Sequence, residues 1–120
     1  MAKILLAEDD SSMRLFLATA LRKAGHKVKS CEDGLSALKI IEQNCDFDLL
    51  LTDIVMPGMD GIELSQKASK ACPNLNVMFI TGFAAVAMGQ KQAAQDNARV
   101  LSKPFHLRDL VDNVDTLLAA

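Results

Sequence analysis

The chain of 120 residues has the length of a single domain that can bury a core, and half of its residues are hydrophobic while only 4% are aromatic. Its formal net charge is -2 and its Lys and Arg residues are scattered. This argues against a clustered basic face, so we expect no DNA partner. No apolar run approaches the roughly 20 residues that span a bilayer, and the N-terminus does not resemble a signal peptide. We therefore expect a cytoplasmic protein without membrane insertion.

The first half of the expected fold begins with a buried strand over 3–7 and a helix over 11–24. Gly25 stands where a left-handed cap ends a helix. Weak alternation over 26–31 indicates a short edge strand, and a second helix is expected over 34–44. The apolar positions expected to face the core are Met13, Phe16, Leu17, Leu21 and Ala24 in the first helix and Leu35, Leu38, Ile40 and Ile41 in the second.

The centre of the chain is an apolar run over 48–52 that ends on a carboxylate, Asp53. Such a run is typical of a strand buried on both faces of a parallel sheet. A helix is expected over 61–71, with Asp60 as its cap and Glu63 reaching back to complete a capping box. Asp53 would then stand at the carboxyl end of a central strand, where open α/β sheets bind their ligands.

The last part of the chain continues the alternation of strands and helices. We expect strands over 76–81 and 99–102, with a helix of small residues over 84–94 between them. The last helix carries an apolar stripe of Leu107, Leu110, Val111, Val114, Leu117 and Leu118. Five strand–helix units predict one domain over 1–120, a doubly wound parallel sheet of five strands with helices on both faces.

The cysteines and histidines show no pattern of a metal site. Cys31, Cys45 and Cys72 are odd in number and lack CxxC spacing, so we interpret them as small core or near-surface residues in a reducing cytosol. His26 and His106 have no neighbours of a ligand type. We expect no metal role for either histidine.

Polar side chains stand at the ends of four strands. Glu8 and Asp9 follow the first strand, Asp53 ends the third, Thr81 ends the fourth and Lys103 follows the fifth. A strand order of 2-1-3-4-5 would gather them on one edge of the sheet. Asp10 is left out of this site, because an acid is favoured at a helix N-terminus by the positive end of the helix dipole.

The charges of these side chains indicate a metal ion. Three acids facing one Lys would repel one another unless a cation neutralised them, and carboxylate oxygens without His or Cys suit Mg²⁺. A carboxylate beside Mg²⁺, a Lys and a hydroxyl forms a phosphoryl-acceptor arrangement in which Asp53 is the nucleophile. The sequence therefore predicts a magnesium-dependent phosphoacceptor.

Taken together, the pair Glu8-Asp9, Asp53 within TDIVMPGMDG, Thr81 before a Gly, and Lys103-Pro104 give the whole chain a specific resemblance. The chain resembles the receiver domain of the CheY-like response regulators of two-component signalling, which have the flavodoxin-like sheet order. The resemblance implies that Asp53 takes a phosphoryl group from an upstream histidine kinase or histidine phosphotransferase.

The same resemblance implies roles for further residues. It implies Mg²⁺ bound by Asp9, Asp53 and the backbone carbonyl of Val55, with Glu8 acting through water. It also implies that Thr81 and Lys103 sense the phosphoryl group and that the peptide bond before Pro104 is cis.

The output is expected to be protein binding, because the chain ends one helix after Lys103. It is similar to the single-domain CpdR-type regulators, so we expect a stand-alone switch rather than a dedicated enzyme, with self-catalysed phosphotransfer and autodephosphorylation. Its partner face would comprise the fourth helix, fifth strand and fifth helix and contact a protein effector, with a role as a protease adaptor. Val100 replaces the aromatic switch residue of many receivers, and Phe83 would substitute for it.

Three alternatives stay open. An aspartyl-nucleophile phosphatase would usually carry a second Asp where this chain has Val55. A flavin- or nucleotide-binding domain would need a Gly- or Thr-rich loop after the first strand, where Glu8 and Asp9 stand instead. The third is a pseudo-receiver that binds partners without ever taking phosphate.

Overall fold

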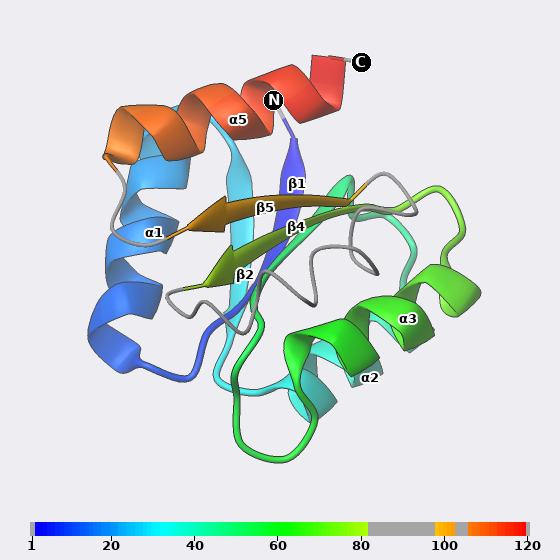
Figure 1. The fold of residues 1–120 in the computed structure, drawn as a ribbon. Coiled ribbons are helices and arrows are strands. Elements are labelled where there is room, and N and C mark those ends of the chain that lie inside the picture. Colours follow the sequence, from blue (N-terminus) through cyan, green and yellow to red (C-terminus); the bar gives the residue numbers. More distant parts are fainter. Residues whose placement is uncertain (1, 82–97, 103–105, 120) are drawn as a thin grey trace.

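The computed structural model describes residues 2–81, 98–102 and 106–119 (Figure 1). Its elements are β1 (Lys3–Ala7), α1 (Ser11–Lys23), β2 (Lys27–Cys31), α2 (Gly34–Gln43), β3 (Leu49–Asp53), α3 (Gly61–Ala71), β4 (Asn76–Thr81), β5 (Ala98–Ser102) and α5 (Leu107–Ala119). Every predicted strand is formed within one residue of its expected bounds, whereas the helix expected over 84–94 lies outside the described residues. No helix in the described part is long and apolar enough to cross a membrane.

The five strands form one parallel sheet in the order β2-β1-β3-β4-β5, which confirms the predicted order. β1 and β3 lie side by side at its centre, with Ala7 opposite Thr52. The next pairing places Asp53 opposite Ile80. The carboxyl ends of β1, β3 and β4 therefore meet at one edge, immediately before the predicted polar residues.

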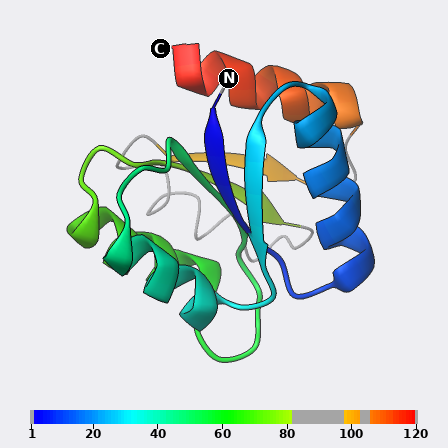
Figure 2. The same ribbon diagram turned by 180° about the vertical axis from the view of Figure 1, so that it is seen from behind.

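Helices cover both faces of the sheet. Figures 1 and 2 show α1 and α5 on one face and α2 and α3 on the other. Successive residues of a strand point to opposite faces, and this alternation divides the core into two clusters. Leu5, Leu50, Val77 and Phe79 pack toward α2 and α3, and Ile4, Leu6, Leu51 and Met78 pack toward α1 and α5. The central strands carry runs of consecutive apolar residues because both sides of the sheet are covered.

Three predicted core positions are wrong, since Phe16 is 49% exposed, Leu35 is 54% exposed and Ala24 is also exposed. In each helix a small residue, Ala18 in α1 and Ala37 in α2, is buried on the face toward the sheet. A small side chain lets the helix axis approach the strands closely. The neighbouring large residue is then rotated away from the sheet toward solvent.

Aspartates begin the first two helices. The carboxylate of Asp10 accepts a hydrogen bond from the backbone N–H of Ser12 at 3.2 Å. Asp33 accepts one from Ser36 at 2.7 Å. Each carboxylate satisfies an N–H that has no partner within its own helix. Asp10 therefore lies at the N-terminus of α1, as the sequence led us to expect, and its carboxylate caps that helix.

The predicted capping box of α3 is formed only in its first half. Asp60 accepts a hydrogen bond from the backbone N–H of Glu63 at 2.8 Å. The Glu63 carboxylate lies 3.0 Å from Lys67 Nζ, one helical turn farther along. This i,i+4 ion pair takes the place of the predicted contact back to the cap.

The cysteines do not behave as three separate residues. Cys45 and Cys72 form a disulfide, and Cys31 is a free, buried thiol. The prediction of unpaired cysteines is wrong for the first two because the segments that follow α2 and α3 converge in space. Burial raises the pKa of the Cys31 thiol, which disfavours its reactive thiolate.

Candidate functional site

Three carboxylates converge at the carboxyl edge of the sheet. Glu8 and Asp9 follow β1, and Asp53 is the last residue of β3. One carboxylate oxygen from each lies within 4.8 Å of the others. Glu8 is 1% exposed, Asp53 is half-buried and Asp9 is exposed. The structure thus brings together the three acids that the sequence predicted, because their strands are neighbours in the sheet.

The backbone and side chain of Glu8 are held by two neighbouring elements. Its N–H donates to the carbonyl of Cys31 at 3.1 Å, at the end of β2. Its own carbonyl accepts a hydrogen bond from the Arg14 guanidinium at 2.7 Å, and its carboxylate accepts one from the N–H of Asp10 at 3.2 Å. Arg14 was not predicted as a supporting residue. Its position in the sequence does not show that its side chain reaches from α1 back to the carbonyl of Glu8.

Asp53 is oriented by the turn that follows it. Its Oδ1 accepts a hydrogen bond from the backbone N–H of Val55 at 3.3 Å. Its carbonyl accepts one from the buried Thr52 hydroxyl at 2.9 Å. The N–H of Ile54 donates to the carbonyl of Ile80 at 3.3 Å, which ties the start of the turn to β4. The carboxylate is therefore presented from a rigid strand end.

The loop between β3 and α3 packs against the start of α2. Gly58 has a φ of 74°, a conformation that favours glycine, and it turns the chain back toward the sheet. A Cβ on Gly34 would lie 2.8 Å from the carbonyl oxygen of Met59. The missing side chain at Gly34 lets the start of α2 support this loop.

The remaining predicted residues belong to β4, β5 and the segments beyond them. Thr81 ends β4 opposite Ser102, and Val100 lies in β5 opposite Phe79. Phe83, Lys103 and Pro104, with the predicted cis bond, lie outside the described residues.

The donor set of the three acids fits a hard divalent cation. Each acid offers carboxylate oxygens, and the group contains neither a sulfur nor an imidazole ligand. Such oxygens are the ligands that Mg²⁺ prefers. The residues present therefore match the predicted magnesium site in chemistry and in spacing.

Comparisons with known proteins agree with the fold and show the family. A family model described as the response regulator receiver domain matches residues 4–115. The chain is 55% identical over 120 residues to the response regulator receiver protein CpdR of Brucella abortus (strain 2308), covering 100% of this chain and 99% of that protein. It is 33% identical over 118 residues to the sensor kinase CckA of the same strain, covering 98% of this chain and 12% of that protein.

A solved structure shows the same architecture. The crystal structure of a response regulator receiver domain protein from Clostridium thermocellum matches with a TM-score of 0.92 at 26% identity, covering 99% of this chain and 95% of that one. Both the predicted resemblance and the predicted sheet are thereby confirmed. The chain belongs to the response regulator receiver domain family, and its interpretation as a phosphoacceptor switch of two-component signalling is confirmed at the level of that family.

Proposed function

We propose that Asp53 is the residue that accepts the phosphoryl group. The observation that carries this assignment is the convergence of Glu8, Asp9 and Asp53 within 4.8 Å at the carboxyl edge of the sheet. Asp53 alone among them stands at the end of a central strand and is half-buried, with its carboxylate oriented by the N–H of Val55. A nucleophile needs this fixed direction of approach.

The metal ligands in this proposal are Asp9, Asp53 and the backbone carbonyl of Val55, with Glu8 binding through water. Mg²⁺ bound there neutralises charge on the oxygens of the transferred phosphoryl group. Glu8 is buried and its carboxylate accepts a hydrogen bond from the N–H of Asp10, so its side chain is held in place beside Asp9. Lys103 would supply the balancing positive charge, and Thr81 would donate its hydroxyl to the phosphoryl oxygens.

The reaction is transfer from a phosphohistidine of an upstream kinase or phosphotransferase. A carboxylate oxygen of Asp53 forms a bond to phosphorus as the phosphorus–nitrogen bond breaks, and the imidazole leaves with the electron pair. Attack of water on the same phosphorus later releases inorganic phosphate and restores the carboxylate. The protein thus promotes its own phosphorylation and dephosphorylation without being a dedicated enzyme. The setting of this reaction in the proposal is the cytoplasm, and the likeness to CpdR and to the sensor kinase CckA supports a kinase donor.

The output in this proposal is a change in affinity for a protein effector. Phosphate on Asp53 shifts the balance between two conformations of the protein that differ in their partner face. That face comprises residues 84–94, β5 and α5. Phe83 and Val100 are the residues proposed to belong to that face. The effector in this proposal is a protein rather than DNA, and the role is that of a protease adaptor.

Intact mass after incubation with phosphoramidate tests the acceptor. We expect one phosphoryl increment that requires Mg²⁺ and is absent in Asp53→Asn. Asp46→Asn is a matched control, because Asp46 is an exposed acid that precedes β3 at the opposite edge of the sheet. An increment that persists in Asp53→Asn, or that is lost in Asp46→Asn, would contradict the assignment.

A further inference from the structure

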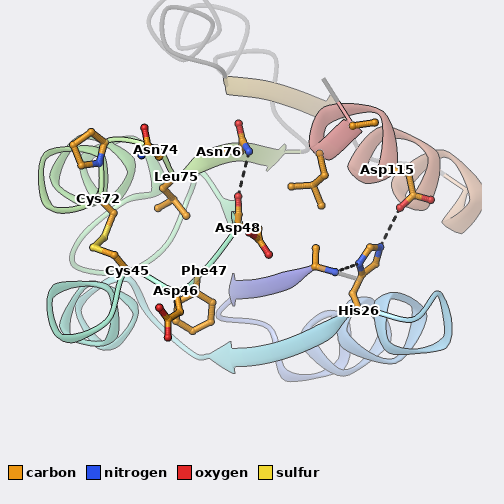
Figure 3. A pocket seen from close by; sticks show the side chains of 14 residues that line it. His26, Cys45, Asp46, Phe47, Asp48, Cys72, Asn74, Leu75, Asn76 and Asp115 are labelled. Atoms are coloured by element: carbon orange, nitrogen blue, oxygen red, sulfur yellow. Dashed lines mark hydrogen bonds and ion pairs between the residues drawn. A yellow bond between two sulfur atoms is a disulfide. The ribbon is translucent and has the colours of Figure 1, made fainter.

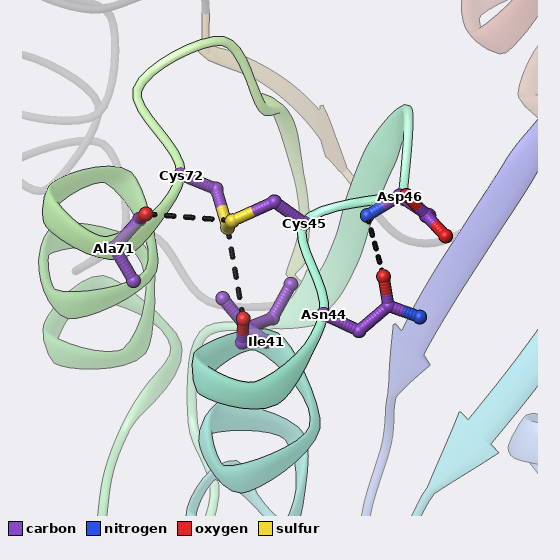
Figure 4. The surroundings of a disulfide bond; sticks show 6 residues. All are labelled: Ile41, Asn44, Cys45, Asp46, Ala71 and Cys72. Atoms are coloured by element: carbon purple, nitrogen blue, oxygen red, sulfur yellow. Dashed lines mark hydrogen bonds between the residues drawn. A yellow bond between two sulfur atoms is a disulfide. The ribbon is translucent and has the colours of Figure 1, made fainter.

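The Cys45–Cys72 disulfide joins the segments that directly follow two neighbouring helices, α2 and α3. Cys45 follows the end of α2 by two residues, and Cys72 is the C-cap of α3 (Figure 4). The bond spans 27 residues of sequence. Cys45 is exposed and Cys72 is buried, so a reagent from solvent reaches the sulfur of Cys45 first.

The surroundings of the two sulfurs suit the dithiol as well as the disulfide. Sγ of Cys45 lies 3.4 Å from the carbonyl oxygen of Ala71, and Sγ of Cys72 lies 3.6 Å from that of Ile41. Neither sulfur carries a hydrogen while the disulfide is intact. After reduction each thiol would find a carbonyl acceptor already in place. Reduction therefore would not leave the buried Cys72 thiol without a hydrogen-bond acceptor.

A cavity leads to this bond. It has a volume of about 660 Å³ and is lined by both cysteines together with Asp46, Asn74 and Asn76 (Figure 3). It lies at the edge of the sheet where β3 begins, whereas Asp53 stands where β3 ends. A small molecule can therefore react at the disulfide without entering the phosphoacceptor site.

We propose that Cys45 and Cys72 form a reversible thiol–disulfide exchange site for small-molecule thiols and disulfides. The cytoplasmic setting of this exchange rests on the proposed function, since disulfides of cytosolic proteins are usually transient or redox-sensing. In reduction, a thiolate attacks Sγ of Cys45, and Cys72 leaves as a thiolate that takes up a proton. A second thiolate then attacks the sulfur of the small molecule in the mixed disulfide, which releases Cys45 and a small-molecule disulfide. Two electrons and two protons pass to the protein.

Opening the disulfide removes a covalent constraint on the layer formed by α2 and α3. These helices pack side by side, and at their other ends Gly34 contacts the loop that carries Met59. The disulfide fixes the ends that are remote from Asp53. Its reduction replaces the covalent link between those ends with packing and with hydrogen bonds from the thiols, so their amide hydrogens should exchange with solvent faster.

The test equilibrates the full chain in glutathione buffers of graded ratio, alkylates free thiols and measures intact mass. We expect two alkyl groups to appear together in one transition, while the buried Cys31 reacts only after unfolding. Cys31→Ser should keep the transition, and Cys45→Ser should abolish it. A protein that stays fully disulfide-bonded, or fully reduced, across the whole range would overturn the proposal.

Hydrogen exchange followed by mass spectrometry gives a second readout. Reduction should speed exchange in peptides from the last turns of α2 and α3 and leave α1 unchanged. Equal exchange in both redox forms would overturn the proposed effect on the α2–α3 layer. Both measurements are made on Asp53→Asn as well as on the unaltered chain, so failure of the phosphoacceptor assignment would leave their outcome untouched.

Discussion

Gly61 packs so closely against Asp53 that a Cβ on Gly61 would overlap the carbonyl oxygen of Asp53. The same Cβ would lie 3.0 Å from the Cα of Ile54, and the N–H of Gly61 donates to the carbonyl of Ile54 at 2.8 Å. The first residue of α3 is thus fixed against the last residue of β3. The turn that carries Val55 is closed by this contact.

Gly61→Ala should therefore displace the start of α3 from the end of β3. The added methyl meets backbone atoms that cannot rotate aside, and overpacking of this kind costs about 1–3 kcal/mol in the free energy of unfolding. Urea unfolding monitored by circular dichroism measures the change. Gln66→Ala, at an exposed position within α3, is the control and should stay within about 0.5 kcal/mol of the unaltered chain. Equal stability of the two variants would show that the turn yields without cost.

The proposed metal site predicts different effects for two adjacent aspartates. Asp9→Asn removes one charge from the cluster with Glu8 and Asp53, so Mg²⁺ affinity should fall about tenfold or more, as it does when residues supporting a metal site are lost. Asp10→Asn should leave the affinity near its original value, because an Asn oxygen can still accept the hydrogen bond from Ser12. Isothermal titration calorimetry measures both affinities. Comparable losses in the two variants would point to general electrostatics rather than to a ligand at Asp9.

Much of the site could be predicted because each acid directly follows an apolar run. Asp53 terminates LLLT, and Glu8 follows KILLA, so the ends of two buried strands were visible in the sequence. The sheet order then placed these ends side by side. The position of a residue at a strand end follows from the local sequence pattern and the sheet order. The convergence of these acids could therefore be predicted without knowing how the side chains pack.

Details that depend on packing were predicted less well. The rotation of α1 about its axis buries Ala18 and exposes Phe16, although a large apolar residue was expected to face the sheet. The Cys45–Cys72 bond depends on the convergence of two segments 27 residues apart. Neither the odd number of cysteines nor their spacing could reveal that convergence.

The cap of α2 predicts a dependence of stability on pH. The hydrogen bond from the backbone N–H of Ser36 lowers the pKa of the Asp33 carboxyl. A carboxyl whose pKa is lower in the folded state stabilises the fold above its unfolded pKa, near 4, and loses this contribution as pH falls through its folded value. The difference in free energy of unfolding between the unaltered chain and Asp33→Ala should be present at neutral pH and shrink below about pH 4.

Urea unfolding over a series of pH values measures this difference. Asp33→Asn is the matched variant, because its side-chain oxygen can still cap the helix while it carries no titrating charge. It should retain part of the stability that Asp33→Ala loses and should not show the acid-dependent part. A difference that stays constant down to the most acidic pH would mean that the Asp33 charge contributes nothing.

The N-terminal strand is anchored by a histidine. His26 Nδ1 accepts a hydrogen bond from the backbone N–H of Ala2 at 3.1 Å, so the ring hydrogen on Nε2 faces Asp115 at 3.1 Å (Figure 3). The His26 side chain is 7% exposed, whereas that of Asp115 is 58% exposed. The first contact is therefore shielded from water and the second is not.

Removing the two partners should consequently have unequal effects. His26→Ala leaves the N–H of the buried Ala2 without its acceptor and should lower the free energy of unfolding by about 1–3 kcal/mol. Asp115→Ala removes a solvent-exposed contact and should cost less than about 1 kcal/mol. Urea unfolding at neutral pH compares the variants. If Asp115→Ala proved the more damaging, the anchor would lie in the contact between His26 and α5 rather than in the contact with the backbone of Ala2.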